Sequence, residues 1–350
     1  MAEEIRAIQY GVGPIGGLIV RVALERGIRF VGAIDIDRDK VGRDLGEVIG
    51  LGRELGTIVS DDAEAVLSRT EADIVLHSTC SYLKDAASQL EGIIKTGLPL
   101  ISTCEELGYP KARCQKEELT YPNPANAGLV ERLDDLARAQ GVAFLGTGVN
   151  PGFVMDRLPA VLSEICHAPR KITVIRVVDA ALRRLPLQRK IGVGLTVKEF
   201  EQMAGKEVRH VGLRESVTAI ADFLAWRLDD ITPETIAPIV AEKPLRTQFF
   251  EVPPGRVAGM RQTMHGVMGD EKVITMDLRM SVGAPDLRDV VRIEATPLEG
   301  YPIPLGPIEN QSTGVHGDIA TAAITVNSIR RVLAARPGLL TMLDIPPAIR

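Results

Sequence analysis

Gly11, Gly13 and Gly16 are the residues whose types and spacing point most directly to chemistry. They follow a short apolar run and precede a helix-like stretch, as in a βαβ unit. There the first glycine permits a tight turn, the second lets the backbone approach a pyrophosphate, and the third lets helix and strand pack closely. The helix N-terminus presents free N–H groups to the phosphates. In this context the spacing is a strong indication of a dinucleotide site, with Pro14 and Ile15 in the same turn.

A carboxylate stands at the expected distance from this turn. Asp35 ends a second apolar run, nineteen residues after Gly16, and can accept hydrogen bonds from the ribose hydroxyls of a dinucleotide. It also repels a 2′-phosphate, so the sequence predicts NAD as the cofactor. NADP stays possible, because Arg38 or Lys40 could turn toward that phosphate. Ile36, next to Asp35, is also expected at the cofactor.

Small hydroxyl and thiol residues follow another predicted strand, at positions 72–77. Ser78, Thr79 and Cys80 come directly after it, and the carboxyl ends of parallel strands share one edge of a sheet. These residues can line the nicotinamide-ribose side of the cofactor, or they can cap the helix that follows. His77 is interpreted as a residue of the strand itself and not as a catalytic group.

Two adjacent glutamates offer the chemistry of proton transfer. Glu105 and Glu106 follow the apolar run at 98–104, which is another strand end at the same predicted edge. A carboxylate beside a buried cleft can act as a general acid or base, because desolvation and mutual repulsion raise its pKa. Acidic residues are also favoured in the first turn of a helix, and the spacing alone leaves both interpretations open.

Polar residues farther along extend this set. Asn150 follows the sixth predicted strand and either belongs to a turn between domains or offers its amide to the nicotinamide carboxamide. His210, His265 and His316 stand in polar or glycine-containing segments, and each is a possible proton carrier because histidine titrates near neutral pH. None of them stands in a metal-ligand pattern, and structural or surface roles are expected for at least two.

The elements that must position these residues alternate between short apolar runs and helical patterns over the first 150 residues. This alternation is typical of an α/β fold with a doubly wound parallel sheet, whose ligand lies at the carboxyl ends of the strands. The predicted strands are 5–10, 28–34, 58–59, 72–77, 98–102 and 142–145, and the predicted helices are 63–67, 83–95 and 127–140.

The pattern changes after a cluster of turn-forming residues at 146–153. Strand-like runs become frequent and helices fewer, which predicts a second α+β domain. A final amphipathic stretch is expected to pack back on the first domain. The predicted domains are 1–150, 151–312 and 313–350. The predicted strands of the second part are 172–178, 246–252, 272–281 and 290–295, and its predicted helices are 154–166, 216–228 and 319–335.

Composition limits the classes of function. The chain has 350 residues, 45% of them hydrophobic and 25% charged, with a net charge of −5. These values fit an ordinary globular protein of two domains and give no indication of nucleic acid or an anionic membrane as partner. The four cysteines lack metal-binding spacing, so we expect free thiols and no metal. No signal-like start or long apolar run is present, and a cytoplasmic location is expected.

Several motifs together resemble the 2,4-diaminopentanoate dehydrogenase family. This family includes the native amine dehydrogenases, and its cofactor domain is similar to that of dihydrodipicolinate reductase. The resemblance covers nearly the whole chain, and the segments around Glu105 and Asn150 are its most specific parts. The matching segments are GVGPIGG (11–17), VGAIDID (31–37), VGRDLGEVIGLGRELG (41–56), STCEELGYP (102–110), GTGVNPGFVMD (146–156), GVGLTVKEF (192–200), HVGLRES (210–216), GDIATAAITVNSI (317–329) and PGLLTMLDIPP (337–347).

The resemblance implies an NAD(P)-dependent amine dehydrogenase. Such an enzyme carries out the reversible oxidative deamination of an amine, or a diamino acid, to a ketone and ammonia, without a metal and as a homodimer formed through the second domain. The resemblance places the family's catalytic glutamate on the pair Glu105 and Glu106, with Glu105 favoured. The expected substrate contacts are Thr147, Asn150, Asp179 and His210.

One segment departs from the family pattern. Between residues 176 and 192 the family tends to an Asn-Asp pair followed by Ser, Pro, Phe and Gly, whereas here Asp179 precedes a run rich in Leu and Arg. If this segment lines the substrate pocket, another amine or ketone replaces the diamino acid as the substrate.

Two alternative functions stay open. One is a dihydrodipicolinate reductase-like imine or C=C reductase that uses the basic cluster at 183–190 as an anion site. The other is a non-catalytic NAD(H)-binding redox sensor.

Overall fold

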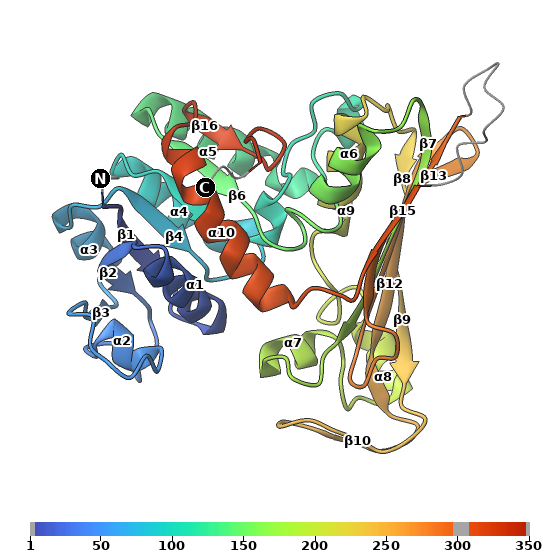
Figure 1. Ribbon diagram of the computed structural model, residues 1–350, viewed down its shortest axis with the longest axis horizontal. Coiled ribbons are helices and arrows are strands. Elements are labelled where there is room, and N and C mark those ends of the chain that lie inside the picture. The colour runs from blue at the N-terminus through green and yellow to red at the C-terminus, as the bar shows by residue number, and fades with distance from the viewer. Residues whose placement is uncertain (1–3, 297–307, 348–350) are drawn as a thin grey trace. The chain divides into compact units, whose positions relative to one another are not determined.

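The computed structural model describes residues 4–296 and 308–347, which form two compact units (Figure 1). Unit 1 comprises residues 4–111, 121–153 and 317–347, and unit 2 comprises residues 112–120, 154–296 and 308–316. The chain passes from unit 1 to unit 2 after residue 153 and returns to unit 1 at residue 317. The short segment 112–120, which nothing in the sequence separates from its neighbours, belongs to unit 2.

Unit 1 contains a parallel seven-stranded sheet in the order β16-β6-β5-β4-β1-β2-β3. The predicted doubly wound sheet is confirmed, with β16 as an additional edge strand. The order reverses at β1, so the carboxyl ends of β1 and β4 flank the point where ligands bind in such sheets. The elements of unit 1 are β1 (Arg6–Tyr10), α1 (Pro14–Glu25), β2 (Arg29–Ile34), α2 (Leu45–Val48), β3 (Val59–Ser60), α3 (Ala63–Arg69), β4 (Ile74–His77), α4 (Leu83–Lys95), β5 (Leu100–Ser102), η1 (Glu105–Leu107), η3 (Pro124–Asn126), α5 (Ala127–Gln140), β6 (Ala143–Gly146), α10 (Gly317–Leu333) and β16 (Gly338–Leu340).

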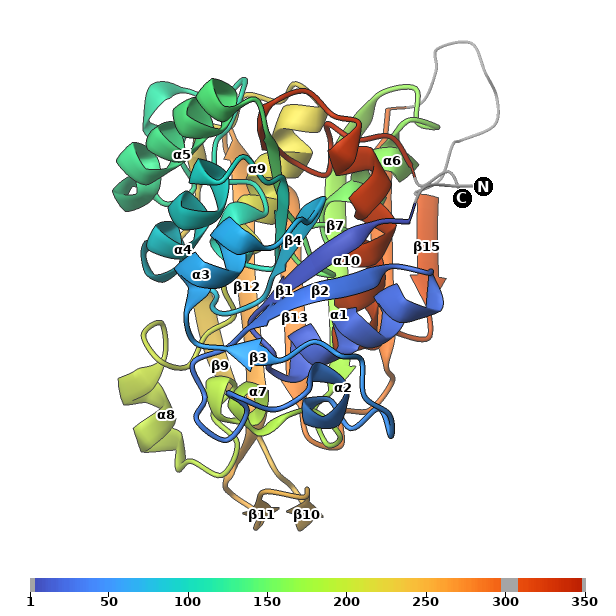
Figure 2. The ribbon, with the colours of Figure 1, turned by 90° about the vertical axis from the view of Figure 1, so that its left-hand side faces the viewer.

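The apolar positions of the helices explain how they cover this sheet. α1 begins at Pro14, whose fixed φ suits the first turn of a helix, and it buries Ile19 and Val20. α10 lies beside α1 (Figures 1 and 2) and buries Ala322 and Ile329 in the same apolar cluster. The C-terminal helix therefore returns to the first domain, as predicted.

Unit 2 contains a mixed sheet in the order β15-β14-β7-β13-β12-β8, with β9 also paired to β12. β7 and β13 are parallel, whereas the other neighbours are antiparallel. The predicted α+β character of this part is confirmed. The elements of unit 2 are η2 (Glu117–Leu119), α6 (Arg157–Ser163), β7 (Pro169–Asp179), α7 (Leu185–Lys190), α8 (Val197–Met203), α9 (Leu213–Phe223), β8 (Asp230–Ile231), β9 (Thr235–Val240), β10 (Leu245–Arg246), β11 (Glu251–Val252), β12 (Val257–Met268), β13 (Glu271–Ser281), β14 (Arg288–Ala295) and β15 (Ile308–Ser312).

The two faces of this mixed sheet differ. One face carries Ile172 and Ile274, and α9 packs on it so closely that a Cβ on Gly266 of β12 would lie 3.1 Å from a methyl of Val217. Residues an odd number of positions away, such as Ile175 after Ile172, point to the other face because side chains alternate along a strand. Helices α6 and α9 lie on the first face (Figure 1).

Three predicted elements of unit 2 need correction, and one strand is additional. The helix expected at 154–166 is limited to α6, because Asp156 caps it by accepting from the N–H of Arg157 at 2.6 Å. The strand expected at 246–252 is the hairpin of β10 and β11, whose turn is held by Thr247. The helix expected at 216–228 is α9, which begins at Leu213 and ends at Phe223. The long strand β12 was not predicted at all.

Candidate functional site

The glycine turn after β1 is shaped by close backbone contacts. Gly11 has a φ of +89° and donates its N–H to the carbonyl of Ile34 at 2.8 Å. A Cβ on Gly11 would lie 2.6 Å from the carbonyl oxygen of Ser78, and one on Gly16 would lie 1.9 Å from that of Gly11. A Cβ on Gly13 would have no described atom within 4 Å. The backbone is therefore closely packed at Gly11 and Gly16, whereas the space beside Gly13 is open, as the approach of a pyrophosphate requires.

The N-terminus of α1 faces this open space. Gly13 is its N-cap residue, and no side chain of the described residues caps the helix. Pro14 at the first position has no N–H to donate. The other backbone N–H groups of the first turn and the positive end of the helix dipole remain for an anion. Ile15, the next residue of α1, packs against the apolar core of unit 1. This arrangement fits the phosphates of a dinucleotide.

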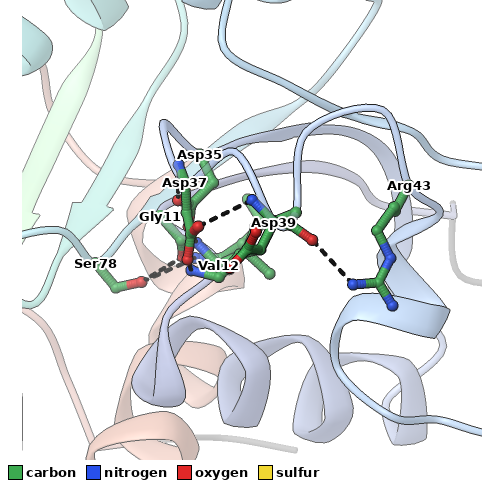
Figure 3. Close-up of polar contacts among 9 residues, drawn as sticks. Gly11, Val12, Asp35, Asp37, Asp39, Arg43 and Ser78 are labelled. Carbon is green, nitrogen blue, oxygen red and sulfur yellow. Dashed lines mark hydrogen bonds and ion pairs between the residues drawn. The ribbon is translucent and has the colours of Figure 1, made fainter.

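Asp35 stands at the end of β2 beside the same turn (Figure 3). Its Oδ2 atom accepts the N–H of Val12 at 2.7 Å, and its Oδ1 atom accepts the N–H of Asp37 at 2.9 Å. The ammonium of Lys40 lies 3.2 Å from Oδ2. Ile36 is 85% exposed and apolar. The carboxylate is thus fixed in direction and keeps unused lone pairs for ribose hydroxyls, with an apolar side chain beside it.

Ser78 holds the turn from the neighbouring strand end. Its hydroxyl donates to the carbonyl of Gly11 at 3.0 Å, and it accepts from the side-chain amide of Gln9 at 3.0 Å. Thr79 is exposed and donates to Gln89 of α4 at 2.7 Å, whereas Cys80 is half-buried. None of the three caps α4, since Tyr82 is its N-cap residue.

His77 is a buried neutral residue, as expected. Burial lowers its pKa to about 4, and the hydrogen bond with Gln89 opposes this only in part. Its Nδ1 atom lies 2.8 Å from the hydroxyl of Ser102, and its Nε2 atom lies 2.8 Å from the side-chain oxygen of Gln89. Its ring therefore links β4, β5 and α4 and carries no charge at neutral pH.

The adjacent glutamates have different surroundings. Glu106 is 7% exposed, and its carboxylate accepts from the N–H of Leu83 at 2.7 Å and from the amides of Asn123 at 2.7 Å and Asn126 at 2.9 Å. It therefore closes the N-terminus of α4 and fixes η1. Glu105 is half-buried and stands at the carboxyl end of β5. These contacts fill most of the hydrogen-bonding capacity of Glu106.

The backbone of η1 also packs closely against the end of β6. A Cβ on Gly146, the last residue of β6, would lie 2.0 Å from the carbonyl oxygen of Leu107. The next residue, Thr147, donates its N–H to the carbonyl of Ser102 at 2.9 Å, and its buried hydroxyl has no partner among the described residues. Asn150 is buried in the following turn. Unit 1 therefore brings the glycine turn and the ends of β4, β5 and β6 to one edge of its sheet.

The other two expected substrate contacts belong to unit 2. Asp179 ends β7, and its Oδ1 atom accepts the N–H groups of Ala181 and Gly283, both at 2.9 Å. The backbone of His210 pairs with the side chain of Gln262 on β12, with distances of 2.7 Å and 2.9 Å. Asp179 therefore has a structural contact within its own unit, and the backbone of His210 is anchored there.

Several polar residues near these groups escaped the sequence analysis. They are Gln9, which supports the glycine turn, and Asn123 and Asn126, which hold Glu106. Only the position of Gln9 directly before the turn could have signalled its role. The two asparagines become neighbours of Glu106 only through folding.

Within the described residues, no three His, Cys, Asp or Glu side chains are grouped so that they could hold a metal ion. In the same part of the chain, no helix combines the length and apolar character that a membrane crossing requires.

A doubly wound sheet with this turn, joined to a unit with a mixed sheet, defines the class of two-domain dehydrogenases. A solved structure with the same arrangement is the amine dehydrogenase of Mycobacterium smegmatis, with a TM-score of 0.83 and 28% identity over 100% of this chain and 98% of that one. The 2,4-diaminopentanoate dehydrogenase of Acetoanaerobium sticklandii is 30% identical over 98% of this chain and 94% of its own length. The amine dehydrogenase of Streptomyces virginiae is 25% identical over 99% and 98%.

The family model for the 2,4-diaminopentanoate dehydrogenase C-terminal domain matches residues 153–349. The chain belongs to the 2,4-diaminopentanoate dehydrogenase family and is an oxidoreductase.

Proposed function

We propose that this protein is an NAD(P)-dependent amine dehydrogenase that interconverts an amine with a ketone and ammonia, with Glu105 as its acid and base. The observation that carries the proposal is the division of the two glutamates. Glu106 is occupied by three donors, whereas Glu105 stands at the carboxyl edge of the sheet that carries the glycine turn. The names of the relatives support the reaction class.

Residues of unit 1 would hold the cofactor. The open space beside Gly13 and the uncapped start of α1 suit the pyrophosphate, and Asp35 suits the adenosine ribose. Ser78 holds the glycine turn through Gly11, and Thr79 and Cys80 stand beside it on the nicotinamide side. Bound nicotinamide supplies hydride transfer to and from carbon.

Glu105 would move the protons of the reaction. In deamination its carboxylate takes a proton from the substrate ammonium, so that the nitrogen lone pair can assist departure of the hydride. After this proton has passed to solvent, the carboxylate takes a proton from the water that attacks the imine carbon. It returns that proton to the nitrogen, so that ammonia leaves as the C–N bond breaks, and the hydroxyl proton is released as the ketone forms. The net change consumes an amine, water and the oxidised cofactor, and it yields a ketone, ammonia, the reduced cofactor and a proton.

Other residues would position the substrate. The buried hydroxyl of Thr147, which has no hydrogen-bond partner among the described residues, and the buried amide of Asn150 are polar groups at the same edge of the sheet. Each can form a hydrogen bond with the carbonyl or amine of a substrate and orient it toward the cofactor. Asp179 and His210 remain further expected contacts from unit 2.

A homodimer formed through unit 2 completes the proposal. The face of the mixed sheet opposite α6 and α9 combines apolar and charged groups. Its Ile175 is half-buried, and Asp277 accepts hydrogen bonds from Arg261 at 2.9 Å and Arg279 at 2.6 Å. Such a mixture of apolar area and charge resembles an interface between subunits.

A spectrophotometric screen tests the reaction class. The purified protein is mixed with NADH or NADPH, ammonium and a series of ketones and keto acids, and cofactor oxidation is followed. We expect oxidation that depends on both ammonium and ketone. Oxidation of cyclic imines without ammonium would instead support a dihydrodipicolinate reductase-like enzyme. Binding of NADH without turnover across the series would support a redox sensor.

A further inference from the structure

Lys40 occupies an unusual position between two carboxylates. Its ammonium lies 3.2 Å from Asp35 and 3.2 Å from Asp37, and its side chain is only 24% exposed. The backbone N–H of Lys40 also donates to the carbonyl of Asp37 at 2.9 Å, which fixes the turn. One cation is therefore shared by the carboxylate expected to bind the ribose and its neighbour.

The other basic side chains of this loop, Arg38 and Arg43, are exposed to solvent or form contacts with other groups. Arg43 donates to the carbonyl of Asp39 at 2.9 Å (Figure 3). It also donates to Glu47 at 2.7 Å. Arg38 is exposed, and no ion pair between it and the two carboxylates occurs in the described part of the chain. Lys40 is thus the cation in contact with Asp35.

The protonation state of this lysine follows from its contacts. Burial lowers the pKa of Lys40, but hydrogen bonds to Asp35 and Asp37 outweigh burial and raise it above the ordinary value. The pKa of Asp37 is lowered by the hydrogen bond from the backbone of Asp39 and by Lys40. At neutral pH the ammonium of Lys40 and the carboxylate of Asp37 are therefore both charged.

We propose that Lys40 determines whether this protein accepts NADP(H) besides NAD(H). With a 2′-hydroxyl on the ribose, Lys40 stays with Asp35 and Asp37, and the carboxylate of Asp35 accepts the hydroxyl. With a 2′-phosphate, the ammonium turns to the phosphate and offsets the repulsion from both carboxylates. The inference rests on the proposed function, because it assumes that a nicotinamide dinucleotide binds at the glycine turn.

The test compares Lys40→Met with the wild type by titration of NADH and NADPH, using the fluorescence of the reduced nicotinamide. We expect the dissociation constant of NADPH to rise roughly tenfold or more, since a hydrogen bond to a charged group is lost. That of NADH should change less than about threefold, because a 2′-hydroxyl needs no cation.

Matched variants separate selectivity from folding. Lys40→Arg keeps the cation, and the ratio of the two dissociation constants should stay within about threefold of the wild type. Arg43→Met removes a cation of the same loop that does not contact Asp35, and it should leave the ratio unchanged. Asp35→Asn removes repulsion and should improve NADPH binding relative to NADH.

Two results would overturn the inference. One is equal weakening of NADH and NADPH binding by Lys40→Met, which indicates a purely structural role. The other is unchanged NADPH binding by that variant, or a wild type that binds NADH but not NADPH. A wild type that binds neither dinucleotide contradicts the proposed function itself, which distinguishes the two failures.

Discussion

At the scale of single residues, burial and hydrogen bonds decide which polar groups are free for chemistry. His77 and Glu106 both stand at the edge of the sheet where a ligand is expected, yet both form hydrogen bonds that connect elements of unit 1. His77 links Ser102 and Gln89, and Glu106 closes the start of α4. The sequence predicted both glutamates at a strand end, but it could not distinguish the surroundings of Glu105 from those of Glu106, because Asn123 and Asn126 approach Glu106 only in the folded chain.

His77 should make the protein sensitive to acid. Its pKa of about 4 in the folded state lies below the ordinary 6.5, so the unfolded state binds a proton first as the pH falls. The stability is therefore complete above pH 6.5 and decreases by about 3 kcal/mol as the pH falls to 4. Urea unfolding at several pH values measures this loss. In His77→Asn the decrease between these pH values should be smaller, and an equal decrease would contradict the assignment.

At the scale of elements, residue patterns predicted the parallel sheet well and the mixed sheet less well. The strands of unit 1 are short apolar runs buried on both faces, a pattern that reads clearly from the sequence. β12 contains Gly259, Gln262 and Gly266, residues that do not favour strands. It is a strand because β13 and β9 pair with it from both sides. This pairing on both sides overrides the local preference of these residues.

The glycine turn allows a test with two similar substitutions. Gly13→Ala places its Cβ in open space, and Gly13 already has a φ of −79°. We expect the free energy of unfolding to change by less than about 1 kcal/mol, while NADH binding is lost because the methyl group fills the place of the pyrophosphate. Urea unfolding and fluorescence titration measure the two effects.

Gly16→Ala should, in contrast, lower the stability of the protein. Its Cβ would lie 1.9 Å from the carbonyl oxygen of Gly11 and 2.8 Å from the hydroxyl of Ser78, so α1 must move away from the turn. We expect a loss of about 1–3 kcal/mol in the free energy of unfolding. If both variants lose equal stability, or if Gly13→Ala binds NADH normally, the described turn is not the cofactor site.

At the scale of the whole molecule, the two units divide the tasks: unit 1 carries the turn and the glutamates, and unit 2 carries the sheet expected at the dimer interface. Alternation of side chains along β7 places Ile175 on the face opposite α9. The sequence predicted two domains because strand patterns change near residue 171. It could not predict that residues 112–120 join unit 2, since their contacts, such as that of Gln115 with Asp222 at 2.9 Å, link distant segments.

A charge on the face of this sheet opposite α6 and α9 should separate the proposed dimer. The wild type is expected at twice the 37.8 kDa of one chain in light scattering after gel filtration. Ile175→Arg should shift it toward the mass of one chain, because an unpaired buried charge is costly at an interface. Leu182→Arg, which changes an apolar side chain that is 94% exposed, is the control and should stay dimeric. A dimeric Ile175→Arg variant would contradict this interface.

The role of Glu105 is tested most directly by the rate of ammonium-dependent NADH oxidation in Glu105→Gln, measured together with NADH affinity. We expect kcat of Glu105→Gln to fall roughly 100-fold or more, because a general acid and base is lost. The dissociation constant of NADH should stay near that of the wild type. Glu106→Gln, in contrast, should lower stability and retain more of the turnover. Near-normal turnover by Glu105→Gln, with its loss in Glu106→Gln, would contradict the account.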